Sequence, residues 1–127
     1  MRNPFDPATR LVYVHTILRG PRGTTALRLA LDTGATVTTI RTASLLLIGY
    51  DLGTDLRRVP LTTGSGVEFV QSVRIDRLEA LGDYRESFPV LAHTLPPSAG
   101  VDGLLGLDFF RDRKLTLDFR AGSITLE

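Results

Sequence analysis

The sequence predicts an all-β fold, and three observations support this prediction. Leu27, Leu29 and Leu31 alternate with small or polar residues, and residues 115–119 alternate in the same way, which is typical of half-buried strands. Clusters that contain Gly and Pro separate such segments and predict turns, at residues 19–23 and 96–100. The length of 127 residues suits one domain with its own hydrophobic core.

The composition narrows the classes of partner and cofactor. The formal net charge is +1 and no basic cluster stands apart from the acidic residues, so we expect no nucleic-acid partner. The chain has no Cys, which excludes disulfides and thiolate metal sites. His15 and His93 are too few for a histidine-rich metal site, and we interpret both as structural. We therefore expect no cofactor and no metal.

Neither a membrane-spanning segment nor a secretory signal is predicted from this sequence. No segment approaches the roughly 20 apolar residues that span a bilayer, and residues 1–10 are polar and contain Pro, unlike a secretory signal. We expect no membrane contact within this chain and favour a cytoplasmic location, while the compartment itself stays unknown. Residues 1–10 are assigned to an N-terminal extension and residues 11–127 to one domain.

The elements follow from local patterns along the chain. Strands are predicted at residues 11–18, 24–31, 36–40, 67–78 and 84–92, where β-branched, aromatic or alternating apolar residues dominate. A short helix is predicted at residues 42–48, with Thr42 as its cap and Gly49 ending it. Phe88 and Val90 are expected in the core. A hairpin is predicted at the C-terminus, where residues 123–126 return after a turn.

Two further segments combine apolar residues with Gly. Residues 61–67 place Gly64-Ser65-Gly66 between β-prone arms, which predicts a hairpin or mobile loop, and a plain turn is the simpler interpretation when this stretch is taken alone. Residues 101–110 predict a buried strand, followed by a helix that Asp108 caps and that extends to about residue 113.

One tripeptide carries the chemistry. The strand that ends at Leu31 is followed by Asp32, Thr33 and Gly34. A carboxylate at the end of a rigid strand is held where packing places it, as catalysis requires. An ordinary Asp-Thr-Gly turn is the alternative, since Asp and Gly are favoured turn residues.

The two motifs together resemble the retropepsin-like aspartic protease family. Asp32-Thr33-Gly34 is the signature of aspartic proteases, and Leu104-Leu105-Gly106 resembles the family's apolar-apolar-Gly segment, which lies beside the catalytic loop. We expect Leu104, Leu105 and Gly106 to brace that loop, with Gly106 where the two backbones nearly touch. The resemblance extends over almost the whole chain.

This resemblance implies a closed barrel with one or two short helices that acts as a two-fold symmetric homodimer. Such proteases use two Asp carboxylates, but only Asp32 stands in an Asp-Thr-Gly context, so the second must come from another copy. The implied activity is hydrolysis of a peptide or protein by water between the two Asp32 carboxylates, and Thr33 cross-links the loops. Substrate-binding residues are expected at Ala35 and in the flap, at Thr63, Gly64, Ser65 and Gly66.

The chain departs from other family members at three positions. Ala35 stands where many relatives have a hydroxyl residue, so we predict a mildly acidic pH optimum. Thr36 and Leu107 replace the Asp and Arg of retroviral members. Losing both partners of a charge pair is coherent, because either one alone would be left uncompensated.

One other function is compatible with the pattern, and a third fits it poorly. A retropepsin-like dimerisation or peptide-binding module with little or no turnover would keep the fold, since a fold does not guarantee an activity. A Ser-His-Asp hydrolase is a poor fit, because the chain has no Gly-x-Ser-x-Gly segment. Activity that depends on protein concentration would distinguish a weakly dimeric enzyme from an inactive module.

Overall fold

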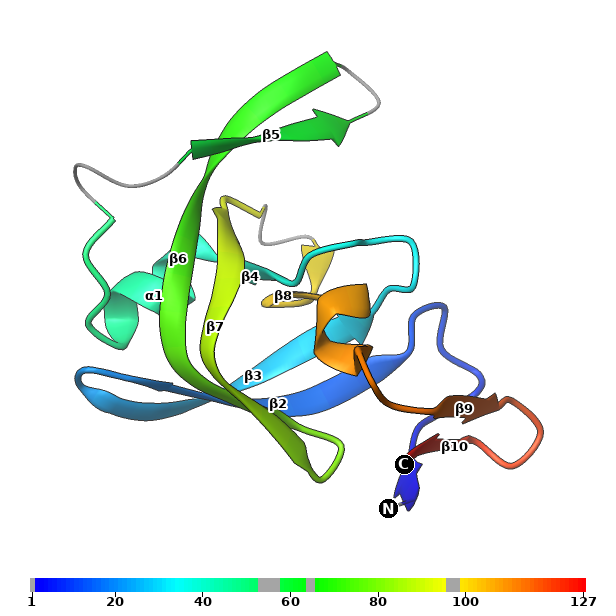
Figure 1. Cartoon of the computed structure of the whole chain (residues 1–127). Helices are drawn as coiled ribbons and strands as arrows, with labels where there is room; N and C mark the ends of the chain where they lie inside the picture. Colours follow the sequence, from blue (N-terminus) through cyan, green and yellow to red (C-terminus); the bar gives the residue numbers. More distant parts are fainter. Residues whose placement is uncertain (1, 53–57, 64–65, 96–98) are drawn as a thin grey trace.

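The computed structural model describes residues 2–52, 58–63, 66–95 and 99–127. Six strands close into a barrel in the order β2-β3-β8-β4-β7-β6, and β6 pairs with β2 to complete the circle. β5 pairs with the far half of β6 and lies outside the closed barrel (Figure 1). The bounds are β2 (Tyr13–Gly20), β3 (Gly23–Leu31), β4 (Thr39–Arg41), β5 (Arg58–Thr63), β6 (Gly66–Ala80), β7 (Asp83–His93) and β8 (Gly103–Leu105). The prediction of an all-β fold is confirmed in its main part, since the fold is mostly β and the barrel is closed.

The barrel interior is filled by the apolar faces of these strands. Phe88 and Val90 are buried, as the sequence predicts. The 3-10 helix η2 (Leu107–Phe110) adds Phe109, which is fully buried and packs edge-on against Phe88. The other fully buried apolar side chains are Leu18, Leu29, Ile40, Leu45, Ile75, Leu78, Leu105 and Ile124. Closing the barrel removes most open sheet edges. The barrel also gives a rigid support to the loop that follows Leu31.

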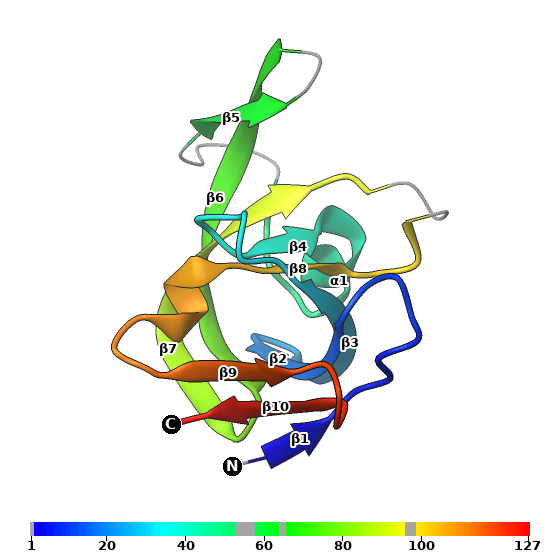
Figure 2. The same cartoon turned by 90° about the vertical axis from the view of Figure 1, so that its right-hand side faces the viewer.

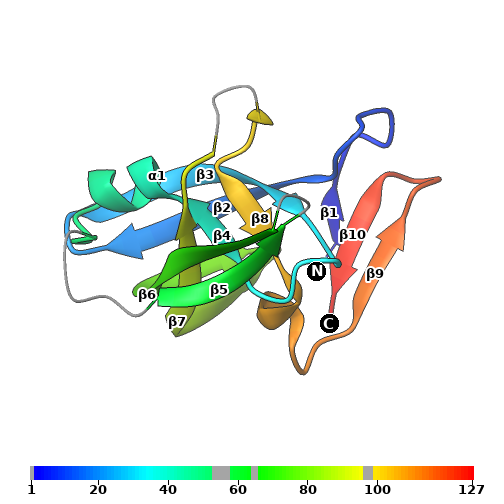
Figure 3. The ribbon, with the colours of Figure 1, turned by 90° about the horizontal axis from the view of Figure 1, so that it is seen from above.

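A second, three-stranded sheet lies beside the barrel (Figure 3). Its order is β1-β10-β9, with bounds β1 (Arg2–Pro4), β9 (Leu115–Asp118) and β10 (Ser123–Leu126). Both ends of the chain therefore lie in this sheet, as Figure 2 shows. Ile124 and Leu126 point into the barrel core, and Phe5 packs edge-on against the exposed Phe119 at 5.5 Å between ring centroids. The division at residue 10 stays a prediction, although residues 2–4 pair with β10.

The helix predicted at residues 42–48 is present and begins at Thr42, but both predicted helix caps are wrong. Helix α1 (Thr42–Leu47) begins after Arg41 at the N-cap position, and no side chain caps it. The helix expected to extend to about residue 113 is only η2, and Asp108 does not cap it, because Gly106 occupies the N-cap position without a side-chain hydrogen bond. The carboxylate of Asp108 is instead used by a distant partner, Thr38. No helix in the described residues is long and apolar enough to cross a membrane.

The long strand β6 serves two structures. Its residues 77–80 pair with β2 and close the barrel, and its residues 66–71 pair with β5 in a hairpin that stands above the barrel (Figure 1). Between these two parts, the pairing of β6 with β7 is interrupted at Asp76 and Ser87. There the hydroxyl of Tyr50 accepts a hydrogen bond from the amide of Asp76 at 2.7 Å and donates to the carbonyl of Arg19 at 2.8 Å. Tyr50 thus fixes the point at which β6 leaves the barrel.

Candidate active site

The loop after β3 holds a half-buried carboxylate. Asp32 comes directly after β3, and its amide donates to the carbonyl of Leu105 at 3.0 Å. Its Oδ1 accepts a hydrogen bond from the amide of Gly34 at 2.9 Å, and its carbonyl accepts one from Ala35 at 3.1 Å. Thr33 and Gly34 are exposed at the tip. The loop is therefore a tight turn that orients the carboxylate and leaves its tip open.

The strand β8 and the two residues after it lie against this loop. β3 and β8 are parallel, with Ala30 opposite Leu104 and Leu31 opposite Leu105. After β8, the amide of Leu107 donates to the carbonyl of Ala35 at 2.8 Å. A Cβ on Gly106 would lie 2.8 Å from that same carbonyl oxygen, which is closer than real Cβ contacts. Gly106 therefore allows the backbone to approach the loop this closely.

One buried hydroxyl of this site, that of Thr38, was not predicted from the sequence. Thr38 is fully buried, and its Oγ1 donates to Oδ1 of Asp108 at 2.7 Å. The amide of Thr38 donates to both carboxylate oxygens, at 3.0 and 2.9 Å. The same Oγ1 accepts a hydrogen bond from the amide of Gly106 at 3.1 Å. The extended segment predicted at residues 36–40 begins as a strand only at Thr39, and this pairing occupies the residue just before it.

A cleft of about 780 Å³ borders the loop. Gly34 and Ala35 line one side, and most of the remaining lining is apolar, including Val37, Leu91 and Leu104. Pro60 of β5 also lines it, so the β5–β6 hairpin borders the same cleft. Among the described residues, the polar ones that line it are Thr36, Thr39, Ser72, His93 and Asp108. Asp32 lies behind Gly34 rather than among the lining residues. A groove with mainly apolar walls and a carboxylate loop at its edge suits an extended ligand with apolar side chains.

The residues proposed for the flap fall only partly within the described structure. Thr63 and Gly66 form the last pair of the β5–β6 hairpin, where β5 ends and β6 begins. Gly64 and Ser65, which would form its tip, lie outside the described residues. Among the described residues, Ala35 lines the cleft and Gly66 does not.

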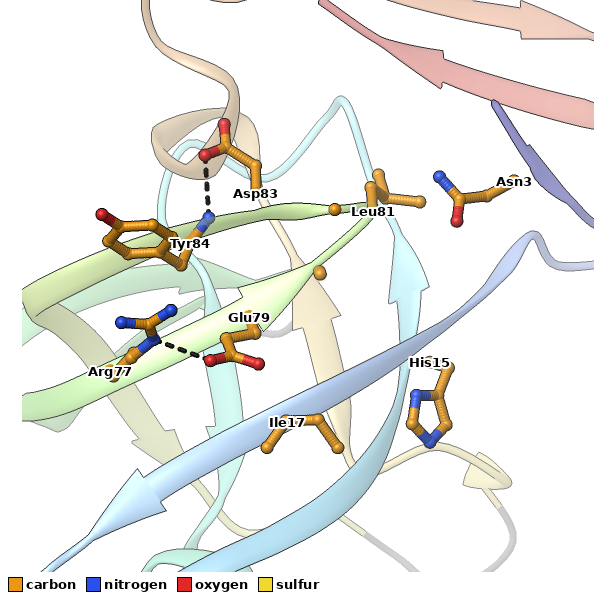
Figure 4. A pocket seen from close by; sticks show the side chains of 10 residues that line it. Asn3, His15, Ile17, Arg77, Glu79, Leu81, Asp83 and Tyr84 are labelled. Atoms are coloured by element: carbon orange, nitrogen blue, oxygen red, sulfur yellow. Dashed lines mark hydrogen bonds and ion pairs between the residues drawn. The ribbon is translucent and has the colours of Figure 1, made fainter. Parts of the chain in front are cut away.

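A smaller hollow of about 380 Å³ lies near the β6–β7 turn (Figure 4). Its charged groups are already paired: Nε of Arg77 lies 2.7 Å from Oε1 of Glu79, and Asp83 binds Nε of Arg113 at 2.6 Å. Burial raises the pKa of Asp83, but hydrogen bonds from Arg113 and from the amide of Tyr84 outweigh it and hold the pKa below its usual value. None of the predicted site residues that the structure describes lines this hollow. In the described residues, no group of three His, Cys, Asp or Glu side chains could hold a metal.

Comparisons with known proteins identify the family and the fold. Residues 22–112 match the family described as "gag-polyprotein putative aspartyl protease", which covers most of the chain. The chain belongs to this family of retropepsin-like aspartic proteases. Its fold is similar to the crystal structure of a retropepsin-like aspartic protease from Rickettsia conorii, with a TM-score of 0.68 and 15% sequence identity. That match covers 99% of this chain and 88% of the other. No curated protein sequence matches.

Proposed function

We propose that the protein is a homodimeric aspartic endopeptidase in which two Asp32 carboxylates, one from each subunit, activate water for peptide-bond hydrolysis. The observation that carries this proposal is the half-buried carboxylate of Asp32, oriented by the amide of Gly34 at 2.9 Å beside an apolar cleft of about 780 Å³. Family membership makes an aspartic protease the first function to consider for such a loop.

The need for a second subunit follows from a count of motifs. Asp32 is the only Asp in the sequence that is followed by Thr-Gly, and peptide hydrolysis of this kind uses two carboxylates. Thr33 and Gly34 are exposed at the loop tip, so the tip is accessible to the same loop of another copy. A two-fold axis at this tip would bring the two carboxylates together, with the Thr33 side chains cross-linking the loops.

The proposed reaction needs no metal and no covalent intermediate. Two carboxylates about 3 Å apart do not both ionise easily, so the pair holds one proton between them. The ionised member accepts a proton from a bound water as that water attacks the peptide carbonyl carbon. The protonated member donates a hydrogen bond to the carbonyl oxygen, where negative charge develops. The pair then returns a proton to the leaving amine.

The cleft supports an extended peptide with apolar side chains as the substrate. Val37, Leu91 and Leu104 give it apolar walls, and a peptide in β conformation would present alternate side chains to them. The β5–β6 hairpin is proposed to cover the bound peptide, with Thr63, Gly64, Ser65 and Gly66 at the connection between its two strands. Closure of such a hairpin excludes water and fixes the scissile bond for attack.

Mass spectrometry of a peptide library tests this function. The library is incubated with wild type and with Asp32→Asn, which keeps the shape of the side chain and removes its charge. Cuts made only by the wild type, with a rate per molecule that rises with protein concentration, are expected. If a demonstrably dimeric wild type makes no cuts, the endopeptidase proposal is wrong, and a peptide-binding or dimerisation module becomes the better interpretation.

A further inference from the structure

Four consecutive residues, beginning with the last residue of β8, bind the proposed catalytic loop and the segment that follows it. The carbonyl of Leu105 accepts from Asp32, the amide of Gly106 donates to Thr38 Oγ1, and the amide of Leu107 donates to the carbonyl of Ala35. Asp108 then accepts three hydrogen bonds from Thr38. Apart from those of Thr38 and Asp108, these contacts are made by backbone atoms, which any residue would supply.

We propose that Thr38 and Asp108 are positioning residues for the catalytic carboxylate, a role that rests on the proposed function. The pair fixes where Gly106 lies, through the hydrogen bond of 3.1 Å from its amide to Thr38 Oγ1. Gly106 directly follows Leu105, whose carbonyl holds the amide of Asp32 at 3.0 Å. A shift of Gly106 would therefore move Asp32 relative to the other subunit's carboxylate, and such dyads depend on that distance.

The direction of each hydrogen bond is determined by the chemistry. A threonine hydroxyl has one proton, and its oxygen here accepts from Gly106, so the proton is available for Asp108. A carboxylate accepts hydrogen bonds at both oxygens, which matches the two donors of Thr38, its amide and its hydroxyl. An amide at position 108 would turn an N–H toward one of these donors. The carboxylate and the hydroxyl are therefore both required.

The kinetic test compares two substitutions of fully buried threonines. Thr38→Val removes the hydroxyl that links Gly106 to Asp108 and keeps the volume. Thr16→Val is the matched control, because Thr16 is equally buried and, within the described residues, its hydroxyl donates only to the nearby carbonyl of Val14, at 3.3 Å. Thr38→Val is expected to lower kcat about 10- to 100-fold with KM within about threefold of wild type. Thr38→Ser, which restores the hydroxyl, should return kcat to within about threefold of wild type.

Amide hydrogen exchange supplies a readout that does not need activity. In Thr38→Val and in Asp108→Asn, the amides of Gly106 and Asp32 should exchange at least about tenfold faster than in wild type, and in Thr16→Val they should not. Asp108→Asn also reports whether the charge is needed, since it keeps one acceptor oxygen.

The outcomes separate this proposal from the proposed function. If folded Thr38→Val keeps kcat within about twofold of wild type, or loses no more than Thr16→Val, the positioning role is wrong. If wild type cleaves nothing, the endopeptidase proposal fails. Hydrogen exchange alone then tests the positioning role of Thr38 and Asp108. Unchanged exchange at Gly106 and Asp32 in both variants would then overturn it.

Discussion

The amide of Asp32 donates a hydrogen bond of 3.0 Å to the carbonyl of Leu105, which lies far along the chain. This contact joins the proposed catalytic loop to the strand β8 that runs parallel to β3. A strand in the middle of a closed barrel has little freedom to move. The hydrogen bond to β8 therefore holds the loop rigidly in place. A preoriented carboxylate costs little reorganisation when the substrate binds.

Gly106 is expected to tolerate no side chain. In Gly106→Ala, the new Cβ would lie 2.8 Å from the carbonyl oxygen of Ala35 and 2.9 Å from the carbonyl carbon of Val37, and both are backbone atoms. We predict a loss of stability of about 1–3 kcal/mol, measured by urea unfolding. Gly34→Ala is the comparison, since its Cβ would meet only Oδ1 of Asp32, at 3.2 Å. An equal or larger loss in Gly34→Ala would contradict this account of Gly106.

The hydroxyl of Tyr50 should stabilise the bend of β6. Tyr50→Phe removes the hydrogen bonds to the carbonyl of Arg19 and from the amide of Asp76, so we predict a loss of about 1 kcal/mol. Urea unfolding at neutral pH measures it. Tyr84→Phe is the control, because Tyr84 is 47% exposed and its ring keeps its contact with Arg77. A similar loss in both variants would mean that the Tyr50 hydroxyl has no special role.

The raised pKa of Tyr50 predicts that the free energy of unfolding falls at alkaline pH. Burial raises the pKa of Tyr50, the carboxylate of Asp76 raises it further, and the hydrogen bond from the Asp76 amide acts in the opposite direction. A raised pKa in the folded state means that stability is complete below the unfolded pKa of about 10 and is lost as pH rises above it. Tyr50→Phe should therefore lose less stability than wild type between neutral and alkaline pH. An identical decline in both proteins would be evidence against this.

The lowered pKa of Asp83 predicts that the free energy of unfolding falls at acidic pH. Burial raises the pKa of Asp83, but its bonds to Arg113 and to the Tyr84 amide lower it more. A lowered pKa contributes stability that is present above the unfolded value of about 3.9 and is lost as pH falls through the folded pKa. Asp83→Asn should flatten the fall in urea midpoint below about pH 4. Glu86→Gln is the control, because its carboxylate is 61% exposed and 3.4 Å from Arg77; the same flattening there would remove Asp83 as the cause.

Local patterns in the sequence predicted the strands well. Apolar alternation at Leu27, Leu29 and Leu31 identified the strand before Asp32, because burial of one face of a strand leaves that period in the sequence. Phe88 and Val90 were assigned to the core for the same reason and are buried. The closed barrel came from the resemblance to the family, since pairing between distant strands leaves no local signal.

The role of Asp108 could not be read from its neighbours. An Asp just before an apolar helix is a frequent cap, and that local rule gave the wrong partner. Its actual partner, Thr38, lies on another segment and is brought near only by the packing of β8 against the loop. A buried threonine among β-branched residues looks like an ordinary strand residue, so the sequence offered no means to find it. The departure marks a position where tertiary contacts override local preference.

One mixing experiment tests most directly whether each dyad takes one Asp32 from each subunit. Wild type and Asp32→Asn are combined at constant total protein, allowed to exchange subunits, and assayed on a peptide that the wild type cleaves. If heterodimers are inactive, an equal mixture should retain about one quarter of the wild-type activity, since about one quarter of the dimers carry two intact loops. Retention of about one half, in proportion to the wild-type fraction, would show that each chain acts alone and would contradict the shared dyad.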